Sequence, residues 1–310
     1  MKKLVFINRY FYPDISATSQ ILSDLVFELP KDSFNIHIIT SRLKYNDDSV
    51  SLTKAERING VQISRVWTTG FGRSNLILRA VDYISFYLSS TIALFRLTDK
   101  NSIIIAKTDP PLISIFALFV AKYKKAILIN WLQDLFPEVP QKLGIKIFQG
   151  FLGTFLLKLR NISLKEAQIN IVLGQKMKDL IISYGVPEAK VKVIHNWADG
   201  ESIVPVAKED NILKKEWGLE GNFVFEYSGN MGLAHEFDLI FSAASALKAN
   251  KNITFLFIGD GAQKVLLEKK AREDSMENIV FKPYQERNML KESLGVGDVH
   301  FISLNPKLKA

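Results

Sequence analysis

Short apolar runs alternate with helix-like stretches from the first residue onward. Within residues 1–195 the runs are rich in Ile and Val, and amphipathic stretches separate most of them. This pattern is typical of a parallel sheet with helices on both faces. The expected strands lie at 4–8, 36–40, 61–67, 102–107, 126–130, 169–174 and 190–196.

A second set of alternating runs follows a segment that has no periodicity. Residues 196–211 contain a Pro, a Gly and several charges, as a linker would. The sequence therefore predicts an α/β protein of two doubly wound domains, 1–195 and 212–310, joined by the linker 196–211. The second set comprises strands at 223–228, 253–259, 279–284 and 298–304 and helices near 236–249, 262–274 and 287–294.

Composition narrows the class of protein. Hydrophobic residues make up 47% and charged residues 23% of the 310 positions, which is typical of a folded globular chain. Cysteine is absent, so disulfide frameworks and thiolate metal sites are excluded, and a reducing compartment is favoured. The four histidines show no ligand spacing, so we expect no metal.

Three apolar segments could serve as targeting or membrane elements. The N-terminal run is too short for a signal peptide, and we interpret it as the first strand of a cytoplasmic domain. The runs at 83–95 and 112–121 are shorter than the roughly 20 residues that a membrane span requires. We therefore expect both to form core helices.

The charge is uneven between the two parts of the chain. Residues 1–195 carry 26 Lys and Arg against 15 Asp and Glu, whereas residues 196–310 carry 14 against 17. A basic domain beside a nearly neutral one indicates attraction to a polyanion. Residues 142–165 combine cations with large apolar residues, which fits either an amphipathic element on anionic lipid or a solvated core helix. Nucleic acid is disfavoured, because basic and aromatic residues do not interleave on any helix.

The stretch YSGNMGLAHEF, residues 227–237, lies where a strand gives way to a helix. A sharp turn there leaves free backbone amides at a helix N-terminus, and these favour an anion such as a phosphate. An ordinary strand-to-helix turn would have the same glycines. Because ligands of doubly wound sheets bind at the carboxyl ends of the strands, we expect this loop to line one interdomain cleft with five others. The other five loops are at 14–19, 109–111, 133–138, 259–261 and 283–284.

Several motifs in order along the chain resemble the family-four retaining glycosyltransferases of the GT-B fold. The resemblance is strongest to the branch that builds bacterial O-antigens, capsules and exopolysaccharides, including fucosamine- and colanic-acid-type transferases. The motifs are FYPDISATSQILSDL (11–25), TDPP (108–111), WLQDLFPE (131–138), VLGQKMKDLI to YGVPEAKVKVIHNWAD (172–199), YSGNMGLAHEFDLI (227–240), FLFIGDGAQK (255–264) and NIVFKPYQER (278–287).

The resemblance implies transfer of a sugar, with retention, from a UDP-sugar donor to a lipid-linked saccharide acceptor, without a metal. The donor would bind the second domain and the acceptor the first, at the cytoplasmic face of the bacterial cell membrane. The expected catalytic residues are Asp134 and Glu138. The expected donor-binding residues are Ser16, Ala17, Thr18, Gly229, Asn230, Gly232, His235, Gly259, Asp260, Gly261 and Tyr284.

Each of these residues also has a structural interpretation. His235 stands where many relatives have lysine, and it could cap the following helix instead of contacting a phosphate. Asp134 and Glu138 could serve as helix N-terminal residues beside Pro137. Tyr284 could be a core residue. Lys264 occupies the place of the third glycine of a dinucleotide fingerprint, which disfavours a nicotinamide-dependent oxidoreductase.

Relatives in this family run on for about half a domain more and carry a pair of glutamates there, so we expect the second domain to be incomplete. An open sheet edge would be a liability for stability. Three functions therefore stay open: an active glycosyltransferase, a donor-binding or membrane-associated protein without turnover, and the less favoured oxidoreductase.

Overall fold

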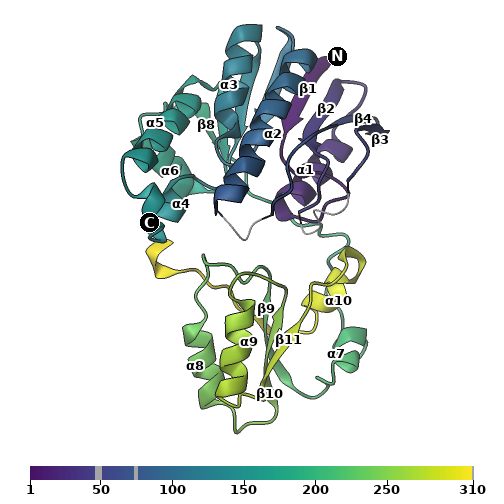
Figure 1. The fold of residues 1–310 in the computed structure, drawn as a ribbon. Coiled ribbons are helices and arrows are strands. Elements are labelled where there is room, and N and C mark those ends of the chain that lie inside the picture. Colours follow the sequence, from purple (N-terminus) through teal and green to yellow (C-terminus); the bar gives the residue numbers. More distant parts are fainter. Residues whose placement is uncertain (46–50, 73–75, 309–310) are drawn as a thin grey trace. The chain divides into compact units, whose positions relative to one another are not determined.

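The computed structural model describes residues 1–45, 51–72 and 76–308. The chain divides into two compact units, Met1–Trp197 (unit 1) and Ala198–Ala310 (unit 2). The predicted linker 196–211 is divided between them, because Asn196 and Trp197 belong to unit 1. Each unit contains a single sheet with helices packed on it (Figure 1).

Unit 1 contains an eight-stranded sheet in the order β3-β4-β2-β1-β5-β6-β7-β8. All neighbouring pairs are parallel except β3 and β4, which are antiparallel. The order reverses between β1 and β5, and this switch point is where doubly wound sheets bind ligands. The strands are β1 Lys2–Ile7, β2 Phe34–Ser41, β3 Ala55–Ile58, β4 Val61–Val66, β5 Ser102–Ala106, β6 Ile127–Trp131, β7 Ile169–Val172 and β8 Val191–Val193.

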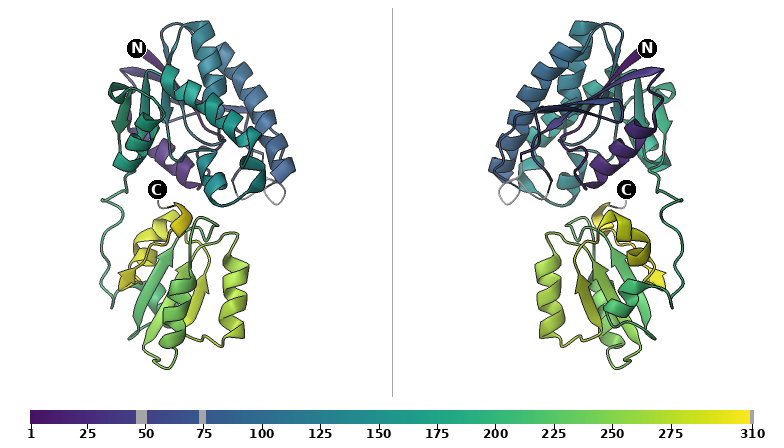
Figure 2. Two further views of the ribbon diagram at one scale, coloured as in Figure 1. Left: turned by 90° about the vertical axis from the view of Figure 1, so that its left-hand side faces the viewer. Right: turned by 90° about the vertical axis from the view of Figure 1, so that its right-hand side faces the viewer.

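The helices of unit 1 cover both faces of this sheet, as the two views in Figure 2 show. Helix α1 packs on one face, and α2 and α3 pack on the other, with α5 beside α3. The helices are α1 Ala17–Glu28, α2 Leu76–Leu97, α3 Ile113–Lys124, α4 Glu138–Lys142, α5 Phe151–Glu166 and α6 Gln175–Ser183, with 3-10 turns η1 Lys146–Phe148 and η2 Glu188–Lys190.

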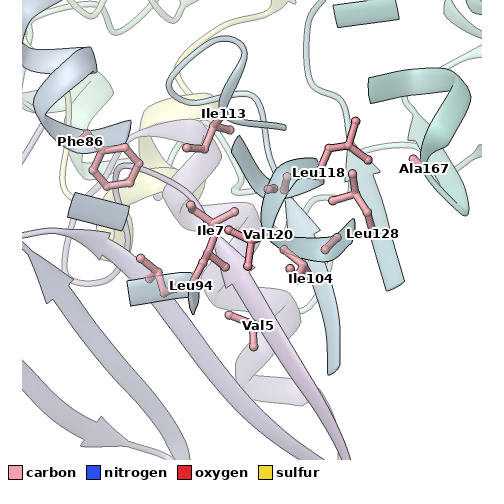
Figure 3. Close-up of a cluster of buried hydrophobic side chains, with 14 residues drawn as sticks. Val5, Ile7, Phe86, Leu94, Ile104, Ile113, Leu118, Val120, Leu128 and Ala167 are labelled. Carbon is pink, nitrogen blue, oxygen red and sulfur yellow. The ribbon is translucent and has the colours of Figure 1, made fainter. Parts of the chain in front are cut away.

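One core cluster of unit 1 fixes α2 and α3 on the sheet. Phe86 and Leu94 of α2 are fully buried against Val5 and Ile7 of β1 and Ile104 of β5 (Figure 3). Fully burying such side chains contributes roughly 1.5–3 kcal/mol each. The inward side of α2 is therefore committed to the protein core.

Unit 2 has a four-stranded parallel sheet in the order β11-β10-β9-β12. Its strand order reverses between β9 and β12, which places a second switch point there. The strands are β9 Phe223–Ser228, β10 Ile253–Ile258, β11 Ile279–Lys282 and β12 Val299–His300. The helices are α7 Ile212–Glu216, α8 Asp238–Ala246, α9 Lys264–Glu273 and α10 Leu290–Leu294, with η3 Arg287–Met289 and η4 Pro306–Leu308.

The structure differs from the predicted elements in three places. The edge strand β3 was not predicted, and the strand expected at 298–304 pairs only at Val299 and His300. The apolar run at 83–95 belongs to a helix of 22 residues, whose stretch Ile77–Leu97 is long and apolar enough to cross a membrane. Only 22% of this apolar stretch is buried, but Phe86 and Leu94 pack in the core, so α2 is a core helix on its inward side only.

Candidate functional site

In unit 2 the loop after β9 packs tightly on the loop after β10. The Met231 amide donates to the Asp260 carbonyl at 2.7 Å, and the Gln263 amide donates to the Met231 carbonyl at 2.9 Å. Gly259 has φ +137°, and a Cβ there would lie 2.1 Å from the Gly229 carbonyl oxygen. A side chain cannot fit at that distance, so this close approach requires glycine.

The same packing explains the other glycines of the two loops. A Cβ on Gly261 would lie 2.5 Å from the Met231 carbonyl carbon, and one on Gly232 would lie 2.9 Å from Asn230 Nδ2. Asn230 therefore lies between Gly232 and Gly261. The sequence-predicted residues Gly229, Asn230, Gly232, Gly259, Asp260 and Gly261 are thus brought together at the carboxyl edge of the unit 2 sheet.

The β9 loop has backbone amides without protein acceptors. Within the described residues, the amides of Asn230, Gly232 and Leu233 make no hydrogen bond. Asn230 and Leu233 are exposed residues, so water or a ligand can reach this part of the loop. The loop leads through Phe237 into α8, whose N-terminus carries a positive partial charge. Such a group of amides can bind an anion.

His235 lies in this loop and is held by the segment after β12. Its Nδ1 lies 2.6 Å from the Ser303 carbonyl oxygen, which can only accept, so Nδ1 carries the proton. The Glu236 amide donates to Ser303 Oγ at 2.8 Å. Nε2 then carries a lone pair when the ring is neutral and donates a hydrogen bond when the ring is protonated. Ser303, which positions His235, was not predicted, because the pair spans 68 residues.

Tyr284 also lies near the glycine loops. Its ring carbon Cε1 would be 3.3 Å from a Cβ on Gly259, and 46% of the residue is exposed. Tyr284 is therefore not a core residue. Asp260 accepts a hydrogen bond from the Gly261 amide at 2.8 Å and is itself exposed.

In unit 1 the loops after β1 and β5 meet at the switch point. The amide of Arg9 donates to the Asp109 carbonyl at 2.6 Å. Lys107, which follows β5, is 1% exposed; its Nζ donates to the Thr18 carbonyl at 3.1 Å and lies 4.0 Å from the centre of the Trp131 ring. Burial lowers the pKa of Lys107 from 10.5 to about 7, against the opposing effect of Asp109.

Asp134 lies in the loop after β6, next to the same edge of the sheet. It lines a small cavity of about 20 Å³, room for one water, together with Lys107, Thr108 and Arg160. The residue is accessible to solvent, yet surrounding protein atoms raise the pKa of its carboxyl, which Thr108 partly offsets by hydrogen bonding. The N-cap of α4 is Pro137, so Asp134 is not the helix cap.

Glu138 has a different environment from Asp134. One of its carboxylate oxygens pairs with Arg160, whose side chain is 5% exposed, and the other is buried without a hydrogen-bond partner among the described residues. Arg160 also lies over the Tyr184 ring at 5.0 Å. The structure thus gives Glu138 an ion pair that leaves its side chain 12% exposed, whereas Asp134 is an exposed residue.

The residues predicted in the first loop of unit 1 surround the start of α1. Ser16 is the N-cap residue, but its side chain makes no capping bond and its Oγ is buried without a partner in the described chain. Ala17 begins the helix, and Thr18 supplies the carbonyl that receives Lys107. These residues lie at the unit 1 switch point.

A buried ion pair supports this edge of unit 1 and was missed from the sequence. Arg9 Nη2 lies 3.6 Å from Asp82 Oδ2, and both side chains are at most 5% exposed. Asp82 on α2 also accepts hydrogen bonds from the amides of Phe71 and Gly72 at 3.0 and 3.2 Å. The pair therefore joins the loop after β1 to the start of α2.

Lys107 makes the stability of unit 1 depend on pH. Between pH 7 and 10.5 the unfolded chain keeps the Lys107 proton and the folded chain releases it, so this group makes stability rise with pH. Lys107→Met should therefore be more stable relative to wild type at pH 7 than at pH 9. We expect the free energy of unfolding of Lys107→Met minus that of wild type, measured in urea, to fall by about 1 kcal/mol for each pH unit.

The exposed Lys100 offers a matched control for that measurement. Lys100→Met reports any general effect of removing one lysine charge from unit 1. If the Lys107→Met difference stayed constant from pH 7 to 9, the buried amine would keep its proton in the folded protein, contrary to its environment.

No protein-family model matches the chain. It is 27% identical over 245 residues to "Probable glycosyltransferase WbjE" of Pseudomonas aeruginosa, covering 76% of this chain and 59% of that protein. It is 26% identical over 189 residues to "Putative colanic acid biosynthesis glycosyl transferase WcaI" of Escherichia coli K12, covering 59% and 46%. The chain thus spans about half the length of the curated relatives it matches.

Solved structures show the fold. HepE of Anabaena, solved in complex with UDP and glucose, matches with a TM-score of 0.68 at 13% identity, covering 97% of this chain and 73% of HepE. Sucrose-phosphate synthase of Thermosynechococcus elongatus matches with a TM-score of 0.69 at 12% identity, covering 97% and 75%. The chain has the GT-B fold, as the sequence motifs predicted.

Proposed function

We propose that this chain transfers a sugar from a UDP-sugar donor, with retention and without a metal, to a lipid-linked acceptor in bacterial surface polysaccharide synthesis. Its two curated relatives are named as glycosyltransferases, and one is named for colanic acid biosynthesis. The HepE structure holds UDP and glucose on the same fold. These likenesses favour a glycosyltransferase over other proteins with doubly wound sheets.

The observation that carries the proposal is the loop of free amides at the unit 2 switch point. The diphosphate of the donor would bind the amides of Asn230, Gly232 and Leu233, beside the N-terminus of α8. When the bond from the sugar to the diphosphate breaks, negative charge grows on the leaving phosphate. Fixed donors at that position lower the barrier because they need no rearrangement during the reaction.

The acceptor would bind at the switch point of unit 1. Asp134 is the proposed base, since a carboxylate with a raised pKa takes a proton from a hydroxyl more readily than an ordinary one. Lys107 and the Arg9–Asp82 pair hold the loops around it. Glu138 would then hold Arg160 in an ion pair and would not contact the acceptor.

His235 provides a test of the donor site that depends on charge. Because Nδ1 donates to Ser303, a neutral ring presents a lone pair to phosphate, whereas a protonated ring presents a donor. His235→Lys places a permanent cation there. It should bind UDP about fivefold tighter than wild type in titration calorimetry.

His235→Ala should bind UDP about tenfold more weakly than wild type. Equal affinities of all three proteins would remove His235 from the donor site.

Activity is tested by incubating the chain with a labelled UDP-sugar and lipid-linked acceptors. Transfer that keeps the anomeric configuration, and that Asp134→Asn reduces about a hundredfold, is the expected result. UDP binding without transfer would favour a donor-binding protein without turnover. NADH binding in place of UDP binding would favour the oxidoreductase.

A further inference from the structure

The outward side of α2 is apolar along most of its length. Val81, Ile84, Leu88 and Ile92 are 39%, 55%, 61% and 53% exposed. Their spacing of three and four residues places them on one side of the helix, over about 16 Å. The only charged residue between Val81 and Ile92 is Asp82, which is buried.

This surface continues onto the neighbouring helix. Phe95 of α2 contacts Phe119 and Tyr123 of α3, with ring centroids 5.7 and 5.3 Å apart. Phe119 is 61% and Tyr123 is 72% exposed. We name the side chains of Val81, Ile84, Leu88, Ile92, Phe119 and Tyr123 the α2–α3 apolar face.

Cations gather where this face ends. Arg96 is exposed at the end of α2, and Lys122 and Lys125 are exposed at the end of α3. Lys124 lies over the Phe95 ring at 5.9 Å. Two acids occur nearby, Asp99 and Glu166, and Glu166 pairs with Lys122. The end of the face therefore keeps an excess of positive charge.

We infer that the α2–α3 apolar face lies in the surface of an anionic lipid bilayer. An exposed apolar strip bordered by lysine and arginine is the pattern of helices that lie in the plane of a membrane. The apolar side chains would enter the acyl boundary, and the cations would contact anionic headgroups. Helix α2 cannot cross the bilayer in this fold, because Phe86 and Leu94 are buried in the core of unit 1 (Figure 3).

The charge favours lipid over a second copy of the chain. A symmetric dimer with parallel α2 helices would bring the same cationic ends near each other, and like charges oppose such contacts. An anionic surface attracts them instead, as it attracts the net positive charge of residues 1–195. The predicted lipid element at 142–165 also exposes apolar side chains, among them Phe151 and Phe155, although its Arg160 is buried in an ion pair.

Vesicle binding by the full chain tests this inference without a donor, so its failure is separate from failure of UDP binding. The chain should sediment with vesicles of phosphatidylcholine mixed with phosphatidylglycerol, and about tenfold less with pure phosphatidylcholine. Ile84→Asn/Leu88→Asn/Ile92→Asn should lower binding about tenfold or more, since three apolar contacts are lost. Arg96→Gln/Lys125→Gln should lower binding to the mixed vesicles only.

The matched control changes exposed apolar residues on α9 of unit 2. Val265 and Leu266 are 71% and 67% exposed, and Val265→Asn/Leu266→Asn should bind the mixed vesicles as wild type does. All the changed side chains are exposed, and circular dichroism checks that each variant folds.

Three further results decide the inference. Leu88→Trp should lose fluorescence with brominated lipids if the face enters the bilayer. Wild-type levels of binding by the triple variant would overturn the inference. An absence of vesicle binding would also overturn it. Self-association of the chain that the triple variant abolishes, without vesicle binding, would point to a second copy of the chain as the partner instead.

Discussion

Gly259→Ala is expected to lose UDP binding and to destabilise unit 2. The new Cβ would lie 2.1 Å from the Gly229 carbonyl oxygen, and φ +137° is strained for alanine in any case. The β9 loop would have to move, and with it the free amides of Asn230 and Gly232. We expect the free energy of unfolding of unit 2 to fall by about 3 kcal/mol, and UDP affinity to fall about a hundredfold.

Gly200 of unit 2 is the matched control. A Cβ there would meet nothing within 4 Å, so Gly200→Ala should change both quantities little. Thermal unfolding with and without UDP measures stability and binding together. If Gly259→Ala bound UDP as wild type does, the packing of the two glycine loops would have no part in donor recognition.

Asp82→Ala is expected to destabilise unit 1 strongly. It removes the carboxylate beside Arg9 and leaves a guanidinium that is 4% exposed without its ion-pair partner. It also removes the acceptor for the amides of Phe71 and Gly72. Breaking a buried pair in this way costs about 3–5 kcal/mol, which urea unfolding would measure.

A surface pair in the same unit provides the comparison. Glu166 pairs with Lys122 at 2.9 Å with both side chains about half exposed, and Glu166→Ala should cost less than about 1 kcal/mol. The double variant Arg9→Ala/Asp82→Ala should cost less than the sum of the two single variants, because no unpaired charge remains. Additive costs would mean that Arg9 and Asp82 do not act as a pair.

Much of the fold follows from the hydrophobic pattern. The expected strand 36–40 lies inside β2 Phe34–Ser41. A run rich in Ile is typical of a strand that is buried on both faces of a parallel sheet. Strand β3 was missed because its residues AERI are alternately exposed and have no apolar run. An edge strand needs only half of its side chains buried, so its signal is weak.

The candidate site was predicted where the backbone itself is constrained. Gly259 and Gly261 are needed for close approach, and glycine is visible in a sequence. Lys107 and Ser303 were missed because their partners, Thr18 and His235, are 89 and 68 residues away. Such pairs depend on which strands are neighbours, and the sequence does not state that β1 lies beside β5.

The outward face of α2 shows the same limit. The apolar run at 83–95 is visible in the sequence. A helix that is buried on one side and a helix that is buried all round can both have this composition. Only the packing of Phe86 and Leu94 shows which side faces the core, and therefore which side is left for lipid.

The position of UDP in a crystal structure of its complex with this chain tests the account most directly. We expect its β-phosphate within hydrogen-bond distance of the amides of Asn230 and Gly232, and near His235 Nε2. A nucleotide bound away from the loop 229–235, for example beside Asp134 in unit 1, would contradict the assignment of the donor to unit 2.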